Sequence, residues 1–173
     1  MSSSRHHSPE PDAAGRPAPP PQAVDALALA PRSVVSNYPE PYASRMAGRV
    51  KRALGDHFGL RNFGVNLTLL APRAQSALRH AHSRQDEFVY VLEGTPTLVQ
   101  DDGEQLLAPG MCVGFRAGSG VSHQLVNRGD APALYLEVGD RSVFDDVSYP
   151  HDDLKATRID ERWLFTTKDG RPL

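Results

Sequence analysis

Short extended segments follow one another between Gly64 and Val138, and this succession constrains the fold more than any other feature of the sequence. Turn-favouring residues separate the segments, and the Asp102-Gly103 pair in particular predicts a hairpin. Short segments at such intervals are typical of an all-β sandwich or jelly roll. The expected strands cover residues 65–70, 75–82, 87–92, 97–100, 105–108, 113–116, 121–127 and 133–138.

Two histidines separated by one residue form the clearest chemical pattern. Alternate residues of a strand point to the same face, so His80 and His82 can bind one cation together. Glu87 begins the next expected strand and can place a carboxylate oxygen on the open side of this pair. His123, from a distant segment, is the best candidate for a fourth ligand. The sequence therefore predicts a metal site of His80, His82, Glu87 and His123.

These residues resemble the first of the two motifs of the cupin family, Gly-x5-His-x-His-x4-Glu-x6-Gly. The sequence matches this motif from His80 to Gly94 and departs from it only at Ala74, where the family has glycine.

The second cupin motif, Gly-x5-Pro-x-Gly-x2-His-x3-Asn, is matched at Gly120, His123 and Asn127. Its first half is altered, with Cys112 at the position of the first glycine and Gly118 at the position of the proline. All four ligand positions of the two motifs are present.

The chain thus resembles a small single-domain cupin over roughly residues 60–140. The resemblance implies a double-stranded β-helix (jelly-roll) barrel that holds one divalent transition metal. Some relatives are labelled as sugar-phosphate isomerases, but one fold hosts many chemistries.

Three imidazoles and one carboxylate suit zinc, iron, manganese, nickel or cobalt, and they leave coordination positions open. Zinc or manganese would act as a Lewis acid, which suits an isomerase or a cyclase acting on a small oxygenated metabolite such as a sugar phosphate. Ferrous iron would suit a dioxygenase. A third alternative is a non-catalytic protein that binds a small ligand. A dedicated sensor usually carries a second output domain, and the sequence shows none, so we expect an enzyme.

Five further side chains are candidates for substrate binding, namely Gln75, Arg84, Tyr90, Arg116 and Asn127. Four of them also have a simpler role: the arginines solvate a surface, Tyr90 packs in a strand, and Asn127 stabilises a turn. No general base other than Glu87 stands out, so the catalytic residue is unknown at this stage.

The ends of the sequence differ in composition from its centre. Residues 1–33 are rich in proline and alanine and are expected to be disordered, which leaves one domain over residues 34–173. The apolar stretch at residues 24–30 is too short to span a membrane. Apolar residues at helical spacing between Met46 and Leu60 predict a short N-terminal helix.

Net charge and cysteine content limit which kinds of partner and which cell compartment we expect. A net charge of -2 gives no basic surface for nucleic acid, and a single cysteine, Cys112, fits a cytoplasmic protein. Cys112 is expected to be a buried small side chain. Residues 88–92 and 134–136 are apolar on both faces of their strands, which favours a homodimer. The expected partners are therefore a small molecule and a second copy of the chain. We expect no binding to a membrane.

Overall fold

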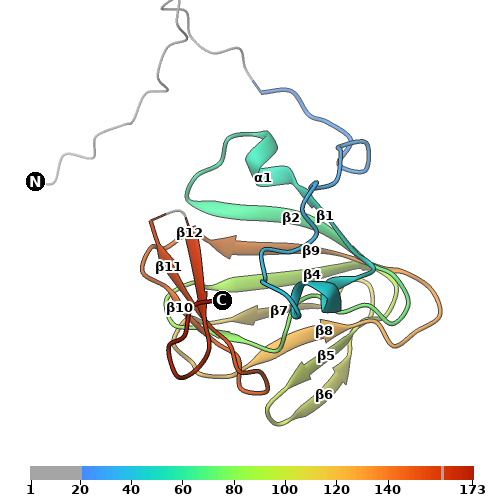
Figure 1. Ribbon diagram of the computed structural model, residues 1–173. Coiled ribbons are helices and arrows are strands. Elements are labelled where there is room, and N and C mark those ends of the chain that lie inside the picture. The colour runs from blue at the N-terminus through green and yellow to red at the C-terminus, as the bar shows by residue number, and fades with distance from the viewer. Residues whose placement is uncertain (1–20, 161) are drawn as a thin grey trace, which may run out of the picture.

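The computed structural model describes residues 21–160 and 162–173, and these form a β-barrel with very little helix (Figure 1). The strands are β1 (Arg49–Ala53), β2 (Phe63–Leu70), β3 (Ala81–His82), β4 (Glu87–Glu93), β5 (Thr97–Gln100), β6 (Gly103–Leu106), β7 (Cys112–Phe115), β8 (His123–Val126), β9 (Ala133–Asp140), β10 (Asp146–Ser148), β11 (Lys155–Ile159) and β12 (Arg162–Thr166). A 3-10 helix, η1 (Ala43–Met46), and one turn of helix, α1 (Leu54–His57), complete the elements. No helix in the described part of the chain is long and apolar enough to cross a membrane.

The strands form three antiparallel sheets. One has the order β1-β2-β9-β4-β7, the second β12-β11-β10-β3, and the third β6-β5-β8. A backbone bridge between His80 and His123 joins the second sheet to the third. These two sheets together face the five-stranded sheet, as expected for a jelly roll.

The structure confirms the all-β prediction and most of the expected strands. The hairpin predicted at Asp102-Gly103 is present between β5 and β6, where Gln100 pairs with Gly103. The expected strand at residues 75–82 is shorter, because only Ala81–His82 is regular strand. The preceding residues still follow β8 through isolated bridges at Gln75 and His80.

The helix predicted between Met46 and Leu60 is wrong for most of its length. Gly48 adopts a φ of +80°, which ends any helix there, and residues 49–53 form β1 instead. β1 pairs with β2 along its whole length, from Arg49 opposite Leu70 to Ala53 opposite Asn66. Strand pairing has therefore overridden an apolar spacing that was itself compatible with a helix. Within the predicted range, only Met46, which ends η1, and Leu54–His57 are helical.

The structure describes only part of the tail that the sequence predicts to be disordered. Residues 1–20 lie outside the described residues. Residues 21–33 are mostly exposed, yet they contact β1: the amide of Arg32 donates to the carbonyl of Lys51 at 2.8 Å, and Arg52 Nε donates to the carbonyl of Leu29 at 2.9 Å.

Two apolar clusters pack inside the molecule, and residues of both line the cavity described below. The first lies between the five-stranded and three-stranded sheets and comprises Leu70, Ala74, Val89, Val91, Leu98, Leu107, Leu125 and Tyr135. The second lies under the C-terminal strands and comprises Met46, Leu78, Val147, Tyr149, Leu154 and Ala156. Burial of these side chains provides the main driving force for folding.

The outward face of the five-stranded sheet also carries apolar side chains. Phe88, Tyr90 and Leu92 of β4 are 42%, 38% and 37% exposed. Cys112, which the sequence predicts to be buried, is exposed on the edge strand β7, where it lies opposite Tyr90. The prediction for Cys112 fails because it took the apolar neighbours of this residue as a sign of burial, whereas alternate residues of β7 face outward.

Candidate metal centre

His80 and His123 are brought together by backbone pairing. The amide of His80 donates to the carbonyl of His123 at 3.1 Å, and the amide of His123 donates back to the carbonyl of His80 at 2.9 Å. Their ring centroids lie 4.8 Å apart. Phe115 of β7 stacks on the His123 ring, with centroids 3.5 Å apart. The backbone thus fixes the positions of both imidazoles, and Phe115 restricts the orientation of the His123 ring.

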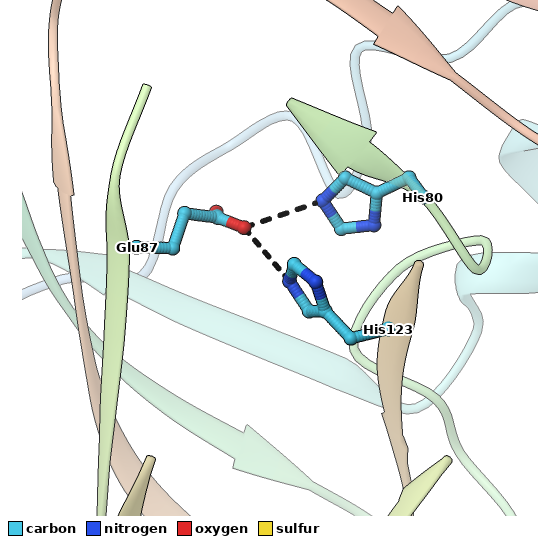
Figure 2. A group of neighbouring side chains, drawn as sticks. All are labelled: His80, Glu87 and His123. Carbon is cyan, nitrogen blue, oxygen red and sulfur yellow. Dashed lines mark hydrogen bonds and ion pairs between the residues drawn. The ribbon is translucent and has the colours of Figure 1, made fainter. Parts of the chain in front are cut away.

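Glu87, the first residue of β4, reaches into this group from the opposite sheet (Figure 2). Its Oε2 atom lies 2.9 Å from His123 Nε2 and 3.5 Å from His80 Nε2. The ligand atoms of these three residues all lie within 4.8 Å of one another. His82 Nε2 faces the same oxygen from 3.7 Å. We call these four residues the histidine cluster.

The other ring nitrogens of His80 and His82 are already engaged. His80 Nδ1 lies 2.8 Å from the carbonyl oxygen of Leu78, and His82 Nδ1 lies 2.5 Å from Asp145 Oδ2. Asp145 is fully buried and also accepts hydrogen bonds from Ser83 Oγ and the amide of Arg84. Such partners orient an imidazole so that Nε2 is left to bind a cation.

The electrostatics of the cluster follow from burial and hydrogen bonding. Burial tends to raise the pKa of Glu87, but hydrogen bonds from His123 and His80 hold it well below its usual value. Burial lowers the pKa of His123 against the opposing effect of Glu87. Burial also tends to lower the pKa of His82, but the hydrogen bond to Asp145 and the charge of Glu87 raise it. Glu87 is therefore ionised and His123 favours its neutral form, which are the states that bind metals.

This donor set fits a divalent transition metal. Three imidazole Nε2 atoms converge on one ionised carboxylate oxygen, and two of the imidazoles are oriented through Nδ1. His80, His82, Glu87 and His123 would hold the ion. Nitrogen donors with a single carboxylate suit zinc, iron, manganese or nickel better than calcium or magnesium.

The histidine cluster lines a cavity of about 230 Å³. The N-terminal residues 34–38 and the C-terminal side chains of Trp163 and Phe165 form part of the same lining. The volume is small compared with the roughly 300–1,000 Å³ that is usual for drug-sized ligands, so a small metabolite is the appropriate occupant.

Charged side chains from β1 and β9 line the same cavity. Lys51 Nζ lies 2.5 Å from Glu137 Oε1, and this oxygen also accepts a hydrogen bond from Asn66 at 3.0 Å. Thr68 Oγ1 lies 3.5 Å from Glu137 Oε2. Arg49 is buried beside them and donates to the backbone carbonyls of Ser76 and Val35. We call Lys51 and Glu137 the lysine–glutamate pair.

The five predicted substrate-binding residues are not among those that line this cavity. Arg84 and Arg116 are exposed on the surface, and Tyr90 points outward from β4. Gln75 forms a backbone bridge with Val126. Arg84, Arg116, Tyr90 and Gln75 therefore have no contact with a ligand at the histidine cluster.

Asn127 has the turn-stabilising role that its position also allowed. It is buried, its Nδ2 donates to the carbonyls of Leu70 and Ala131, and its Oδ1 accepts the amide of Gly129 at 3.1 Å. Its side chain is thus occupied by the backbone of the loop before β9.

Glycine is required at Gly94 of the first motif. Gly94 has a φ of +74°, and a Cβ atom there would lie 2.5 Å from the carbonyl oxygen of Pro132. A larger residue would push β4 away from the chain that leads into β9.

Sequence reasoning missed Asp145, Lys51 and Glu137. Asp145 lies in a loop with no distinguishing pattern. Glu137 did carry a signal, since it is the one charged residue among the apolar residues at 133–138. Arg49 and Lys51 are two residues apart and therefore lie on the same face of β1. This shared face is visible only if the segment is treated as a strand.

Comparisons with known proteins agree with this architecture. The family model described as Cupin domain matches residues 66–139. No curated protein is significantly similar to the chain.

Several solved structures are similar. A cupin-superfamily sugar phosphate isomerase from Silicibacter pomeroyi is 44% identical with a TM-score of 0.83, and the match covers 88% of this chain and 96% of that one. A candidate sugar phosphate isomerase from Acidithiobacillus ferrooxidans is 32% identical with a TM-score of 0.66, over 72% of this chain and 80% of that one. The polyketide cyclase RemF from Streptomyces resistomycificus, 20% identical with a TM-score of 0.57 over 69% and 78% of the two chains, shares the fold. Both motifs, the barrel and the extent of these matches lead to one conclusion: the chain belongs to the cupin superfamily.

Proposed function

We propose that this protein is a metal-dependent isomerase that acts on a small oxygenated metabolite, with sugar phosphates as its substrate class. The observation that carries the proposal is the convergence of three imidazole Nε2 atoms on the Glu87 carboxylate inside a small cavity. A divalent ion held there supplies Lewis-acid chemistry, which polarises a carbonyl group and makes the adjacent C–H bond more acidic.

The charges around the cavity support an anionic substrate. Arg32, Arg49 and Lys51 line it, and only Lys51 has a carboxylate partner among the described residues. A buried guanidinium bonded only to backbone carbonyls keeps its full positive charge, as Arg49 does here. With a divalent ion added, the cavity would carry a net positive charge that favours a phosphate monoester or a carboxylate.

The names of the similar structures point to the same class. The Silicibacter pomeroyi protein is named as a sugar phosphate isomerase, and it matches almost the whole of the described chain. The Acidithiobacillus ferrooxidans protein is named as a candidate sugar phosphate isomerase.

The test is direct assay of the metal-loaded protein. Protein reconstituted separately with zinc, manganese and ferrous iron is incubated with ribose 5-phosphate, arabinose 5-phosphate, glucose 6-phosphate and mannose 6-phosphate. We expect aldose-to-ketose conversion with at least one of them, followed by ¹H NMR, and no conversion by the His123→Ala variant. Binding of these compounds without conversion would instead support the non-catalytic alternative. Oxygen uptake only with iron would support a dioxygenase.

A further inference from the structure

The lysine–glutamate pair lies in the cavity of the histidine cluster but is separate from it. Glu137 does not belong to the group whose ligand atoms could hold a metal, and its carboxylate is 20% exposed. Lys51, from β1, is 18% exposed. Among the described residues, two carboxylates line this cavity, and because Glu87 is committed to the histidines, Glu137 is the one left for a ligand.

The register of the five-stranded sheet sets how Glu87 and Glu137 lie relative to each other. β4 pairs with β9 so that Glu87 lies opposite Gly139, and Val89 lies opposite Glu137. Glu87 and Glu137 are therefore diagonal neighbours on the same inward face, and the backbone positions of such neighbours lie about 7–8 Å apart. Gly139 has no side chain, and the Glu87 side chain lies over it: a Cβ atom at Gly139 would lie 3.8 Å from Glu87 Cγ.

The two oxygens of Glu137 differ in their surroundings. Oε1 accepts hydrogen bonds from Lys51 at 2.5 Å and Asn66 at 3.0 Å. Oε2 has only Thr68 Oγ1, at the long distance of 3.5 Å. Two donors thus fix the carboxylate through Oε1, while Oε2 keeps lone-pair capacity for another proton donor.

An oriented carboxylate near a bound substrate is suited to general-base catalysis. The first requirement for such a base is that it lies within hydrogen-bonding distance of the proton that it removes. A purely structural ion pair gains little from a place inside a cavity, because desolvation offsets most of the attraction between the charges. Here the pair lies on the wall of a cavity that also holds the candidate metal ligands.

We propose that Glu137 is the general base of this cavity and that Lys51 and Asn66 position it. This proposal rests on the proposed isomerase function. The C–H bond next to the substrate carbonyl breaks, its proton passes to Glu137 Oε2, and its electron pair enters the carbon–carbon bond of an enediolate. Glu137 then returns the proton to the former carbonyl carbon, and the neighbouring hydroxyl proton moves to the former carbonyl oxygen. The product is an isomer with no atom gained or lost.

The experiment compares four proteins, each reconstituted with manganese. They are the wild type, Glu137→Gln, Glu137→Asp, and the control Glu104→Gln. Glu104 is an exposed residue of β6 paired with Arg128, so its variant also removes the charge of a glutamate in an ion pair, but outside the cavity. Each protein is incubated with the four aldose phosphates in D₂O, and loss of the C2 proton signal gives the rate of proton abstraction. Manganese content and the dissociation constant of each sugar phosphate are measured in parallel.

We expect Glu137→Gln to keep its manganese and to bind the sugar phosphate within about threefold of wild type, while proton exchange falls by about 100-fold or more. Glu137→Asp should retain part of the exchange, and Glu104→Gln should match the wild type. Equal exchange in Glu137→Gln and wild type would overturn the role of Glu137 and leave the isomerase proposal standing. Loss of manganese in Glu137→Gln would also overturn it, since the residue would then act through the metal site. No exchange by the wild type would overturn both proposals.

Discussion

The histidine cluster and the lysine–glutamate pair occupy the same cavity but are built in different ways. The imidazoles of His80 and His123 are fixed by mutual backbone hydrogen bonds, and His82 is fixed by the buried carboxylate of Asp145. Lys51 and Glu137, in contrast, meet across β2, which lies between their strands β1 and β9. In the functions proposed above, the first group binds the metal ion and the second transfers the proton.

If the two groups have the proposed roles, mutations can separate metal binding from proton transfer. Changes in the histidine cluster should remove the ion and with it all activity. Changes in the lysine–glutamate pair should leave the ion in place. The following predictions go from the largest expected effect on metal binding to the smallest.

The largest effect is expected from His80→Ala or His123→Ala. Each variant loses one nitrogen donor, and the loss should exceed the 10- to 100-fold that is typical for a residue that only supports a ligand, so we expect more than about 100-fold weaker binding. Metal affinity is measured by competition with a chelating dye, and folding by circular dichroism. His57→Ala, at an exposed histidine of α1, is the control and should bind like the wild type. Unchanged affinity in both cluster variants would rule out the site.

An intermediate effect is expected from Asp145→Asn. This change removes the carboxylate that orients His82 and should weaken metal binding by about 10- to 100-fold. Asp146→Asn, at the exposed neighbour, serves as the control and should change the affinity little. A wild-type affinity in Asp145→Asn, measured with the same dye, would mean that His82 does not depend on Asp145 to bind the ion.

Lys51→Met should leave metal affinity within about threefold of wild type. It leaves the partly buried Glu137 carboxylate without its charged partner, so the free energy of unfolding should fall by about 1–3 kcal/mol. Adding Glu137→Leu should recover part of this loss, because the unpaired charge is then removed. Urea denaturation gives the stabilities. A drop in metal affinity as large as that of Asp145→Asn would show that the two groups are not independent.

The smallest effect on the cavity is expected from Tyr90→Asp, on the outward face of β4. Metal affinity should be unchanged, because this side chain does not line the cavity. The homodimer predicted from the sequence provides a second measurement: sedimentation should give a dimer for wild type and a smaller species for Tyr90→Asp. A wild type that is monomeric at every concentration would refute the homodimer.

The sequence was most informative where the chemistry depends on local spacing. Of the four predicted ligands, His80, Glu87 and His123 lie with their ligand atoms within 4.8 Å of one another, and His82 Nε2 lies 3.7 Å from Glu87 Oε2. That these residues bind a metal stays a prediction. Most strands were also predictable, since short alternating segments between turns leave few other folds.

The parts that escaped prediction depend on contacts between distant segments. Lys51 was assigned to a helix, because apolar residues at helical spacing cannot reveal that β2 offers a strand to pair with. Its partner Glu137 lies 86 residues away in the sequence, and no local pattern links them. The predicted substrate contacts at Arg84 and Arg116 lacked support for the same reason: proximity to the ligands in the sequence does not determine which residues line the cavity.

The central claim is that one ion binds at the histidine cluster, and anomalous diffraction from crystals of the manganese- or zinc-reconstituted protein tests it most directly. Data collected on both sides of the metal absorption edge locate the ion without reference to its ligands. The account predicts one anomalous peak per chain, bounded by the Nε2 atoms of His80, His82 and His123 and by the carboxylate of Glu87. An absent peak in fully reconstituted protein, or a peak only at other side chains, would contradict it.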